Sequence, residues 1–195
     1  MPVMSAIESA FCRSGPWRHL ARRWVLPWAL DGVELQGDVL EIGGGSGAMA
    51  EGMARRFPNT RLTVTDVDGA MVRAAGHRLQ DHPNVKVERA DVTALPYAGG
   101  SFDVVTTYLM LHHVIDWTDA LREAARVLRP GGTLIGYDLT DTALARLTHR
   151  LDGSPHRIIA HDELTEGLAV AGFRDINVVL SARRHLMRFR AKGGE

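Results

Sequence analysis

Glycines cluster between residues 43 and 47, directly after a short apolar run. Val39, Leu40 and Ile42 are typical of a buried strand, and glycine follows at positions 43, 44, 45 and 47. Glycine permits tight turns and lets a ligand approach the backbone, because no Cβ is in the way. A helix-compatible segment follows from residue 48 to 57, and the first N–H groups of a helix can bind a polar ligand. A strand, a glycine loop and a helix in this order indicate a site for a nucleotide-like cofactor.

Three carboxylates lie at or near the ends of successive strand-like runs. Glu41 precedes the glycine loop, Asp66 closes the second run and Asp91 closes the third. In an open α/β sheet, ligands bind beyond the carboxyl ends of the strands, where the strand order reverses. Each carboxylate alone could be an ordinary strand-end or turn residue. Asp68 is an alternative ribose partner to Asp66, although it fits better as the N-cap of the next helix.

Strand-like and helix-like segments alternate from residue 37 onward. Strands are expected at 38–42, 61–65, 85–89, 102–107 and 133–139, with helices at 48–57, 69–80 and 118–128. Arg129-Pro130-Gly131-Gly132 should end the third helix. The runs 173–180 and 185–191 are too close for a crossover helix and should form an antiparallel hairpin. The pattern predicts an α/β fold, with a doubly wound, mostly parallel, Rossmann-like sheet of seven strands that ends in this hairpin.

The length of 195 residues and an apolar content of 45% fit one domain with a sizeable core. Residues 6–30 should form one or two helices, with Trp17, Leu20 and Trp24 at helical spacing. Trp17, Trp24, Trp28, Phe11 and Met4 could line an apolar pocket, but an aromatic stripe at helical spacing favours core packing, and the two roles are compatible. We therefore expect a single domain over 1–195, with a helical cap over 1–36 and the sheet-containing core over 37–195.

Charge and cysteine content narrow the range of partners. Lys plus Arg and Asp plus Glu each number 23, so the formal net charge is zero and gives no reason to expect nucleic acid or a membrane surface. Cys12 is the only cysteine, which excludes an internal disulfide and fits a reducing compartment. No signal peptide is visible, and the apolar run 24–30 is too short to span a bilayer. We expect a cytoplasmic protein with a small-molecule substrate. The arginines of the final hairpin leave a nucleic-acid groove as an alternative, and the oligomeric state is not predicted.

From residue 37 to about 140, the chain resembles the class I S-adenosylmethionine-dependent methyltransferases with the type 11 methyltransferase domain. Glu41-Ile-Gly-Gly-Gly-Ser-Gly47 resembles the first motif of that family, an acidic residue followed by glycine at every second position. Residues 65–68 resemble its ribose-binding strand end, and residues 89–92 its adenine-binding segment. Further similarity covers residues 101–105, 111–114 and 128–134.

The resemblance implies S-adenosyl-L-methionine as the cofactor, methyl transfer as the activity and no metal. Glu41 is expected to reach the methionine ammonium, Asp66 both ribose hydroxyls and Asp91 the adenine amine. The residues implied for cofactor binding are Glu41, Gly43, Gly44, Gly45, Gly47, Asp66, Val67, Asp91, Val92 and Thr107.

Methyl transfer from a sulfonium is an in-line displacement that depends on positioning and on exclusion of water. A general base is needed only if the acceptor, at O, N or C, must lose a proton. His113, His112 and Tyr108 are the candidate catalytic residues, since they follow the fourth strand and imidazole titrates near neutrality. Alternatively, the two histidines open a helix and pack against the cofactor. Adjacent histidines do not make a metal site without further ligands.

Two other classes of protein fit part of the pattern. Gly43-x-Gly45-x-x-Ala48 matches the dinucleotide fingerprint of an NAD-binding oxidoreductase, with Asp66 about 20 residues further on. Glu41 argues against that class, because a carboxylate there would repel a pyrophosphate and would suit a cationic cofactor. The second alternative is a non-catalytic S-adenosylmethionine-binding protein that regulates a partner.

Overall fold

A computed structural model describes residues 14–142, 157–181 and 184–194. The N-terminal helical segment consists of α2 (Gly15–Leu20), the π-helix η1 (Ala21–Val25) and α3 (Leu26–Leu30). The remaining helices are α4 (Ala48–Arg56), α5 (Gly69–Leu79), the 3₁₀ turn η2 (Leu111–His113), α6 (Trp117–Val127) and α8 (His161–Val170). The strands are β1 (Asp38–Ile42), β2 (Arg61–Asp66), β3 (Val85–Arg89), β4 (Phe102–Tyr108), β5 (Leu128–Leu139), β6 (Arg174–Leu180) and β7 (Leu186–Lys192). Cys12 and the start of the expected N-terminal helices lie outside the described residues.

The seven strands form one sheet in the order β3-β2-β1-β4-β5-β7-β6. β1 pairs in parallel with β2 and β4, and the parallel pairing continues to β3 and β5. β7 is antiparallel to both β5 and β6. The predicted doubly wound sheet with a terminal antiparallel hairpin is therefore confirmed.

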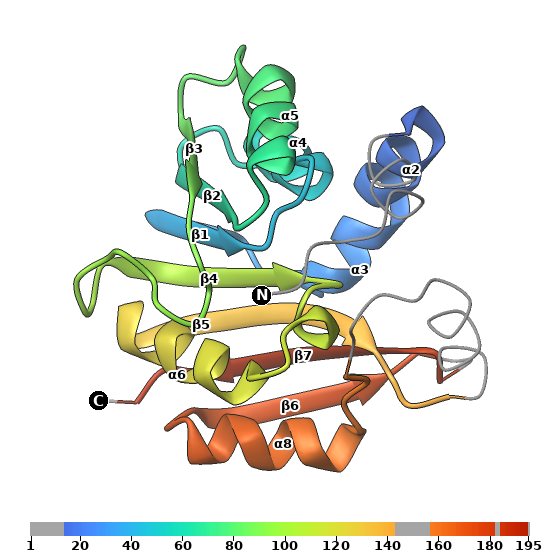
Figure 1. Ribbon diagram of the computed structural model, residues 1–195, viewed down its shortest axis with the longest axis vertical. Coiled ribbons are helices and arrows are strands. Elements are labelled where there is room, and N and C mark those ends of the chain that lie inside the picture. Colours follow the sequence, from blue (N-terminus) through green and yellow to red (C-terminus); the bar gives the residue numbers. More distant parts are fainter. Residues whose placement is uncertain (1–13, 143–156, 182–183, 195) are drawn as a thin grey trace.

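Helices cover the two faces of this sheet and create two separate cores. Leu40 and Leu134 belong to the core that contains residues of α6 and α8, whereas Val39 and Ile135 belong to the core beneath α3 and α4. Figure 1 shows α6 and α8 beside β5, β6 and β7, and α4 and α5 beside β2 and β3. Because side chains alternate across a strand, neighbouring residues of β1 and of β5 serve opposite faces.

The fifth strand begins earlier than the sequence predicts. The Arg-Pro-Gly-Gly run does follow the end of α6 at Val127, but β5 already pairs with β4 from Leu128, opposite Phe102. The pairing register then shifts before Val104, and Gly131 adopts a φ of 71°. The residues expected to form a turn, 129–132, therefore form the bulged start of β5. This is possible because glycine can take a left-handed backbone conformation without steric cost.

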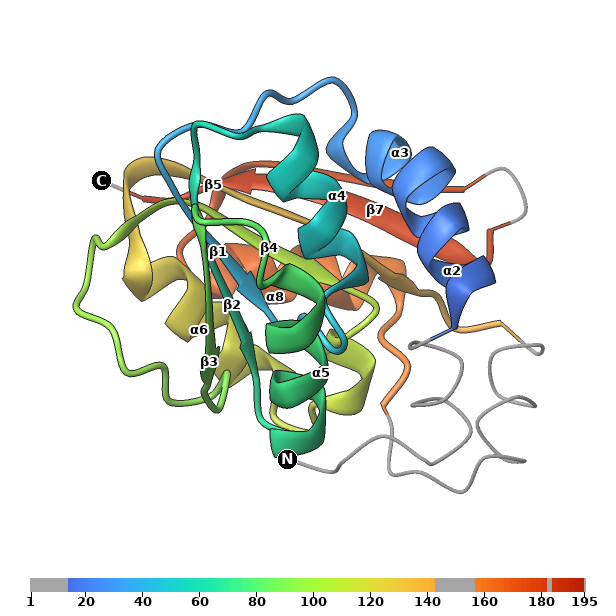
Figure 2. The same ribbon diagram turned by 90° about the horizontal axis from the view of Figure 1, so that it is seen from above.

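The N-terminal helices pack along α4 and reach β5, as Figure 2 shows from above. Ala21, Leu26 and Leu30 are buried there, but Leu20 is 45% and Trp24 66% exposed. The interpretation of Trp24 as part of a core-packing stripe is therefore wrong. The π-helical turn explains the difference, because its wider i→i+5 spacing rotates side chains away from the face predicted by a 3.6-residue period.

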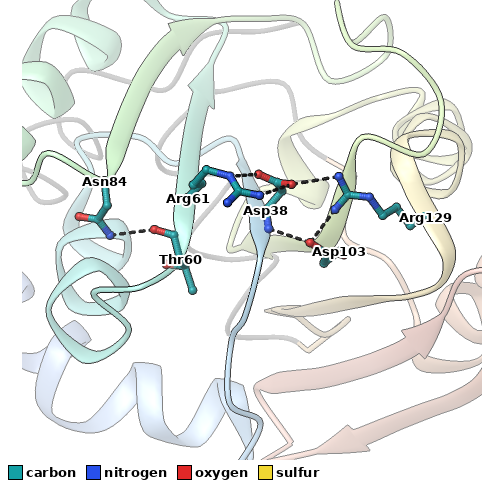
Figure 3. Close-up of polar contacts among 6 residues, drawn as sticks. All are labelled: Asp38, Thr60, Arg61, Asn84, Asp103 and Arg129. Carbon is teal, nitrogen blue, oxygen red and sulfur yellow. Dashed lines mark hydrogen bonds and ion pairs between the residues drawn. The ribbon is translucent and has the colours of Figure 1, made fainter.

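An ion-pair network joins four strands at the amino edge of the sheet (Figure 3). Arg61 donates to both oxygens of Asp38 at 2.6 and 2.8 Å, and Arg129 donates to Asp38 at 2.9 Å. Arg129 also pairs with Asp103 at 2.6 Å, and Asp103 accepts the backbone N–H of Asp38 at 2.8 Å. The network fixes the starts of β1, β2, β4 and β5 relative to one another. Asp103 therefore has a structural role at the start of β4.

No helix within the described residues is long and apolar enough to cross a membrane.

We predict that Asp38→Asn lowers the free energy of unfolding at neutral pH by about 1 kcal/mol or less, because its partners are partly exposed to water. The hydrogen bond from Arg61 is the main cause that lowers the pKa of Asp38 below its usual value of 3.8. The stabilisation is therefore present above that value and is lost as the pH falls through the lowered pKa. Urea unfolding at about pH 7 and about pH 3 tests this.

The matched control is Asp81→Asn, which changes an exposed carboxylate in a turn. Its effect should be near zero at both pH values. An Asp38→Asn effect that persists undiminished at low pH or in about 1 M salt would contradict an ionic origin.

Candidate functional site

The strand order reverses beside β1, since the chain builds β2 and β3 on one side of it and then returns to β4 on the other. In such sheets the crevice at the reversal is the usual ligand site. A pocket lies there, beyond the carboxyl ends of β1 and β4. Its lining residues are Glu41, Gly43, Gly44, Gly45, Ser46, Ala48, Met49, Tyr108, Leu109 and Tyr137.

The glycines of the loop have different surroundings. A Cβ on Gly43 would lie 2.1 Å from Cγ of Met110, and one on Gly44 would lie 2.5 Å from Cγ1 of Val64. These two glycines therefore let the loop pack against the protein. Gly45 has a φ of 55°, yet no atom lies within 4 Å of its ideal Cβ position. Its backbone borders open space, which a ligand can approach closely.

Hydrogen bonds from neighbouring elements hold the loop in place. The Gly45 N–H donates to Oδ2 of Asp66 at 2.9 Å, which ties the loop to the end of β2. Arg78 of α5 donates to the carbonyl oxygen of Ser46 at 2.7 Å and to its hydroxyl at 2.9 Å. Gly47, with a φ of 78°, is the N-cap of α4. The loop is thus pre-shaped by the surrounding structure.

Glu41 is the most unusual charge in the pocket. Its side chain is 1% exposed, and Oε2 has no hydrogen-bond partner among the described residues. Burial and, secondarily, the nearby Asp66 carboxylate raise the pKa of Glu41 to about 8. A carboxyl group held in this way gains most from a cationic or hydrogen-donating ligand.

Asp66 and Asp68 have separate roles in the structure. Oδ1 of Asp66 accepts the Asp68 N–H at 2.9 Å, in addition to the bond from Gly45. Burial raises the pKa of Asp66, and these two backbone donors offset only part of that effect. Asp68 accepts the N–H of Ala70 at 2.7 Å, so its interpretation as the N-cap of α5 is confirmed.

Asp91 adjoins the same edge but faces a turn. Its Oδ1 accepts the backbone N–H of Thr93 at 2.9 Å and the Thr93 hydroxyl at 2.7 Å. The N–H of the preceding Ala90 donates to the carbonyl of Asp66 at 3.1 Å, which places the two strand ends side by side. Burial raises the pKa of Asp91, but the bonds from Thr93 outweigh it and the net shift is downward.

The structure brings only part of the implied cofactor set into the pocket itself. Glu41, Gly43, Gly44 and Gly45 line it. Of the remainder, Asp66, Val67, Asp91 and Val92 lie at or after the ends of β2 and β3, Gly47 caps α4, and Thr107 lies on β4. Val92 is buried in the core shared with α6. The cofactor set therefore forms a band along the carboxyl edge.

Thr107 and Tyr108 end β4 beside the pocket. Thr107 is buried, and its hydroxyl has no hydrogen-bond partner within the described part of the chain. The Tyr108 hydroxyl donates to the sulfur of Met53 at 3.6 Å. Burial and then the Glu41 charge raise the pKa of Tyr108 well above its ordinary value, so that it is a neutral phenol at neutral pH.

His112 and His113 form the 3₁₀ turn after β4 rather than opening an α-helix. Within this turn His112 is buried, and its Nδ1 is hydrogen-bonded to the buried carboxylate of Asp138 at the end of β5. The His113 ring lies tilted against that of His112, with ring centroids 4.1 Å apart. The sequence analysis did not predict the His112–Asp138 pair.

Sequence reasoning also missed two residues of the pocket, Met49 on α4 and Leu109 after β4, because no motif marks them. Leu109 has a φ of 51°, which is rare for a leucine, and its N–H donates to the Tyr137 carbonyl at 2.9 Å. Strained backbone of this kind concentrates at functional sites. Among the described residues, no group of three or more His, Cys, Asp or Glu side chains could hold a metal ion.

Comparisons with known proteins agree with this geometry. Residues 40–136 match the model of a methyltransferase domain family. A ubiquinone/menaquinone biosynthesis C-methyltransferase UbiE from Pseudomonas fluorescens (strain SBW25) is 33% identical over 143 residues, which are 71% of this chain and 55% of that protein. A malonyl-[acyl-carrier protein] O-methyltransferase from Hahella chejuensis is 32% identical over 144 residues, 70% of this chain and 50% of that protein. The chain thus spans about half the length of the curated relatives it matches.

Solved structures share the fold at low sequence identity. In the complex that contains the Haloferax volcanii Trm112 methyltransferase activator, one chain has a TM-score of 0.81 at 18% identity, covering 99% of this chain and 100% of that chain. Phosphoethanolamine N-methyltransferase 2 of Haemonchus contortus, solved with S-adenosyl-L-methionine, has a TM-score of 0.76 at 17% identity, covering 88% of this chain and 53% of that chain. The glycine loop, the strand order and the matched family model together show that the chain belongs to the class I S-adenosylmethionine-dependent methyltransferases with the type 11 methyltransferase domain.

Proposed function

We propose that this protein binds S-adenosyl-L-methionine along the carboxyl edge of β1, β2 and β4 and transfers its methyl group to a small-molecule acceptor. The observation that carries the proposal is the buried carboxyl group of Glu41, which has no donor among the described residues and lies beside a glycine loop whose Gly45 borders open space. A compact cation satisfies such a carboxylate, whereas a pyrophosphate would be repelled. The NAD-binding alternative is therefore the weaker one.

Each part of the cofactor has a matching feature in the site. Glu41 pairs with the methionine ammonium. Asp66 accepts hydrogen bonds from the ribose hydroxyls with the lone pairs that its two backbone donors leave available. Asp91 and the backbone of Val92 serve the adenine. Thr107 and Tyr108 lie where β4 ends, next to the position of the transferable methyl. Tyr108 acts there as a neutral phenol that shapes the pocket and does not accept a proton.

The acceptor side of the site is proposed from its surroundings and from the relatives. These relatives are named for C-methylation in ubiquinone/menaquinone biosynthesis and for O-methylation of malonyl-[acyl-carrier protein]. A small acceptor with a carbon or oxygen nucleophile is the class we propose here. The helices α2 and α3 pack on α4 and β5 beside the pocket. We propose that residues 1–36 cap the site and that the whole chain forms one domain.

Asp66→Ala should weaken binding of S-adenosyl-L-methionine at least about tenfold, because each charge-assisted hydrogen bond to a ribose hydroxyl contributes about 1.5–3 kcal/mol. Isothermal titration calorimetry measures this directly. The matched control is Asp68→Ala, which removes the N-cap of α5 and should lower stability by about 1 kcal/mol with little change in affinity. Equal losses of affinity in both variants, or a loss only in Asp68→Ala, would refute the ribose assignment.

The affinity for the cofactor should rise with pH on the acid side of neutrality. In the free protein the pKa of Glu41 is about 8, so the group is largely protonated at lower pH. A bound ammonium favours the carboxylate, and binding therefore releases a proton. Between about pH 6 and 7.5 the affinity should increase by up to about tenfold per pH unit.

Glu41→Gln separates this effect from other titrations. It should bind the cofactor with an affinity that hardly changes over the same pH range, and its binding heat should not depend on the ionisation enthalpy of the buffer. The Gln variant should also gain stability relative to the wild type as the pH rises from about 4.5 to about 8, since a raised acid pKa lowers stability over that interval. A wild-type affinity that falls as the pH rises from 6 to 7.5 would rule out proton release by Glu41.

A further inference from the structure

The His112–Asp138 pair is the one buried ion pair that the cofactor site does not explain among the residues that the structure describes. The two side chains are 4% and 1% exposed. Asp138 accepts from Nδ1 of His112, from the His112 backbone N–H at 3.3 Å and from the Leu139 N–H at 2.7 Å. The pair joins the turn after β4 to the end of β5 at the carboxyl edge of the sheet.

The cost of this arrangement points to a function. Burial of a carboxylate costs several kcal/mol, and a buried ion pair is often no more stable than apolar residues of similar size. Burial raises the pKa of Asp138, but its interaction with His112 and the hydrogen bonds from His112 and Leu139 more than offset it, so Asp138 stays ionised. Perturbed, paired titratable groups next to a pocket are candidates for proton transfer.

The pair lies close to the pocket in the fold. Tyr137 lines the pocket together with Leu109, three residues before His112. Asp138 follows Tyr137 in β5 and points to the opposite face of the sheet, so the pair lies at the same carboxyl edge without lining the pocket itself. Asp138 shares its face of β5 with Gly136, which pairs with Thr107 of β4. The pair therefore adjoins the end of β4 where we place the transferable methyl group.

Resting on the function proposed above, we propose that Asp138 is a positioning residue that holds His112 as the Nδ1–H tautomer, so that Nε2 removes a proton from a hydroxylated acceptor, a phenol or an enol. A hydrogen bond to one ring nitrogen fixes the tautomer and orientation of an imidazole and stabilises the imidazolium that forms. The same carboxylate makes the imidazole a stronger base.

The step balances as a single displacement. The acceptor O–H proton moves to Nε2 of His112, and the oxygen lone pair, or the enolate carbon conjugated to it, attacks the methyl carbon. The carbon–sulfur bond breaks, and its electron pair stays on sulfur as the neutral thioether of S-adenosylhomocysteine. The imidazolium is stabilised by Asp138 and later returns its proton to water.

The presence of such a base selects the class of acceptor. A carboxylate acceptor is already ionised at neutral pH and needs no base, and an amine can lose its proton after transfer. A phenol has a pKa near 10, as tyrosine does, and becomes a strong nucleophile only when its proton is removed. A histidine base therefore fits a phenolic or enolic acceptor.

Other groups face His112 and bear on any pH profile. The His113 ring is in contact with its ring. The Arg157 backbone N–H donates to the His112 carbonyl at 2.8 Å, while its guanidinium pairs with Glu163 and lies 6.0 Å from the Trp117 ring centroid. Among these groups, Asp138 is the carboxylate bonded to the His112 ring.

The test compares two acceptors with tritiated S-adenosyl-L-methionine. At about pH 8.5 phenol must lose its proton on the enzyme, because its pKa is near 10, whereas the more acidic 4-nitrophenol is already largely ionised. Asp138→Asn should lower kcat for phenol by about 100-fold, the size of a typical general-base contribution, and for 4-nitrophenol by less than about tenfold. The control Asp103→Asn changes a carboxylate at the opposite edge and should leave both rates and their pH profiles unaltered.

Calorimetry with S-adenosyl-L-methionine distinguishes the two levels of the proposal. If the wild type does not bind S-adenosyl-L-methionine, the proposed function itself is overturned. Equal slowing of phenol and 4-nitrophenol by Asp138→Asn, with cofactor affinity retained, would overturn only the positioning role, as would absence of transfer to either phenol by the wild type.

A measurement on the wild-type chain needs no variant to fold. Long-range ¹H–¹⁵N spectra report which ring nitrogen of a histidine carries the proton, and the signals of His112 are those missing from His112→Gln or, if that variant does not fold, those coupled to the sequentially assigned His112 backbone. A neutral ring protonated at Nδ1 near pH 7.5 supports the proposal. A ring protonated at Nε2 alone, or a doubly protonated ring up to about pH 9, overturns it.

Discussion

A carboxyl group buried beside the glycine loop is the constraint on which the site depends. Glu41 lies on β1, where the alternation of the strand turns it toward the face covered by α3 and α4. Placing a polar group there without a donor is costly, and the raised pKa of Glu41 shows how the free protein accommodates it. A cationic ligand removes that cost. In the proposed function, the affinity for the cofactor would thus derive partly from a destabilising feature of the unliganded fold.

The two edges of the sheet divide the tasks of stability and function. At the amino edge, Asp38, Arg61, Asp103 and Arg129 satisfy one another and fix the strand starts. At the carboxyl edge lie Leu109, with a left-handed backbone, and the buried oxygens of Glu41 and Thr107 that have no hydrogen-bond partner among the described residues. Rigid strand starts allow the opposite ends to hold such strained groups in place, since one sheet connects them.

The sequence predicts the parts of this structure that depend on local pattern. Continuous apolar strands, the glycine loop and the close spacing of the last two strands determine the doubly wound sheet and its hairpin, and an Asp directly before the next helical run predicts the N-cap at Asp68. The His112–Asp138 pair joins residues 26 positions apart and depends on how β4 and β5 align, which no local pattern encodes. The exposure of Trp24 depends on a π-helical turn that ordinary periodicity does not anticipate.

A crystal structure of the full chain with bound S-adenosylhomocysteine tests the central claim most directly. It should show the amino group of the ligand within reach of Glu41, its ribose hydroxyls on Asp66 and its adenine beside Asp91. A ligand that occupies a different cavity, or that leaves Glu41 buried without a new polar partner, would contradict the account.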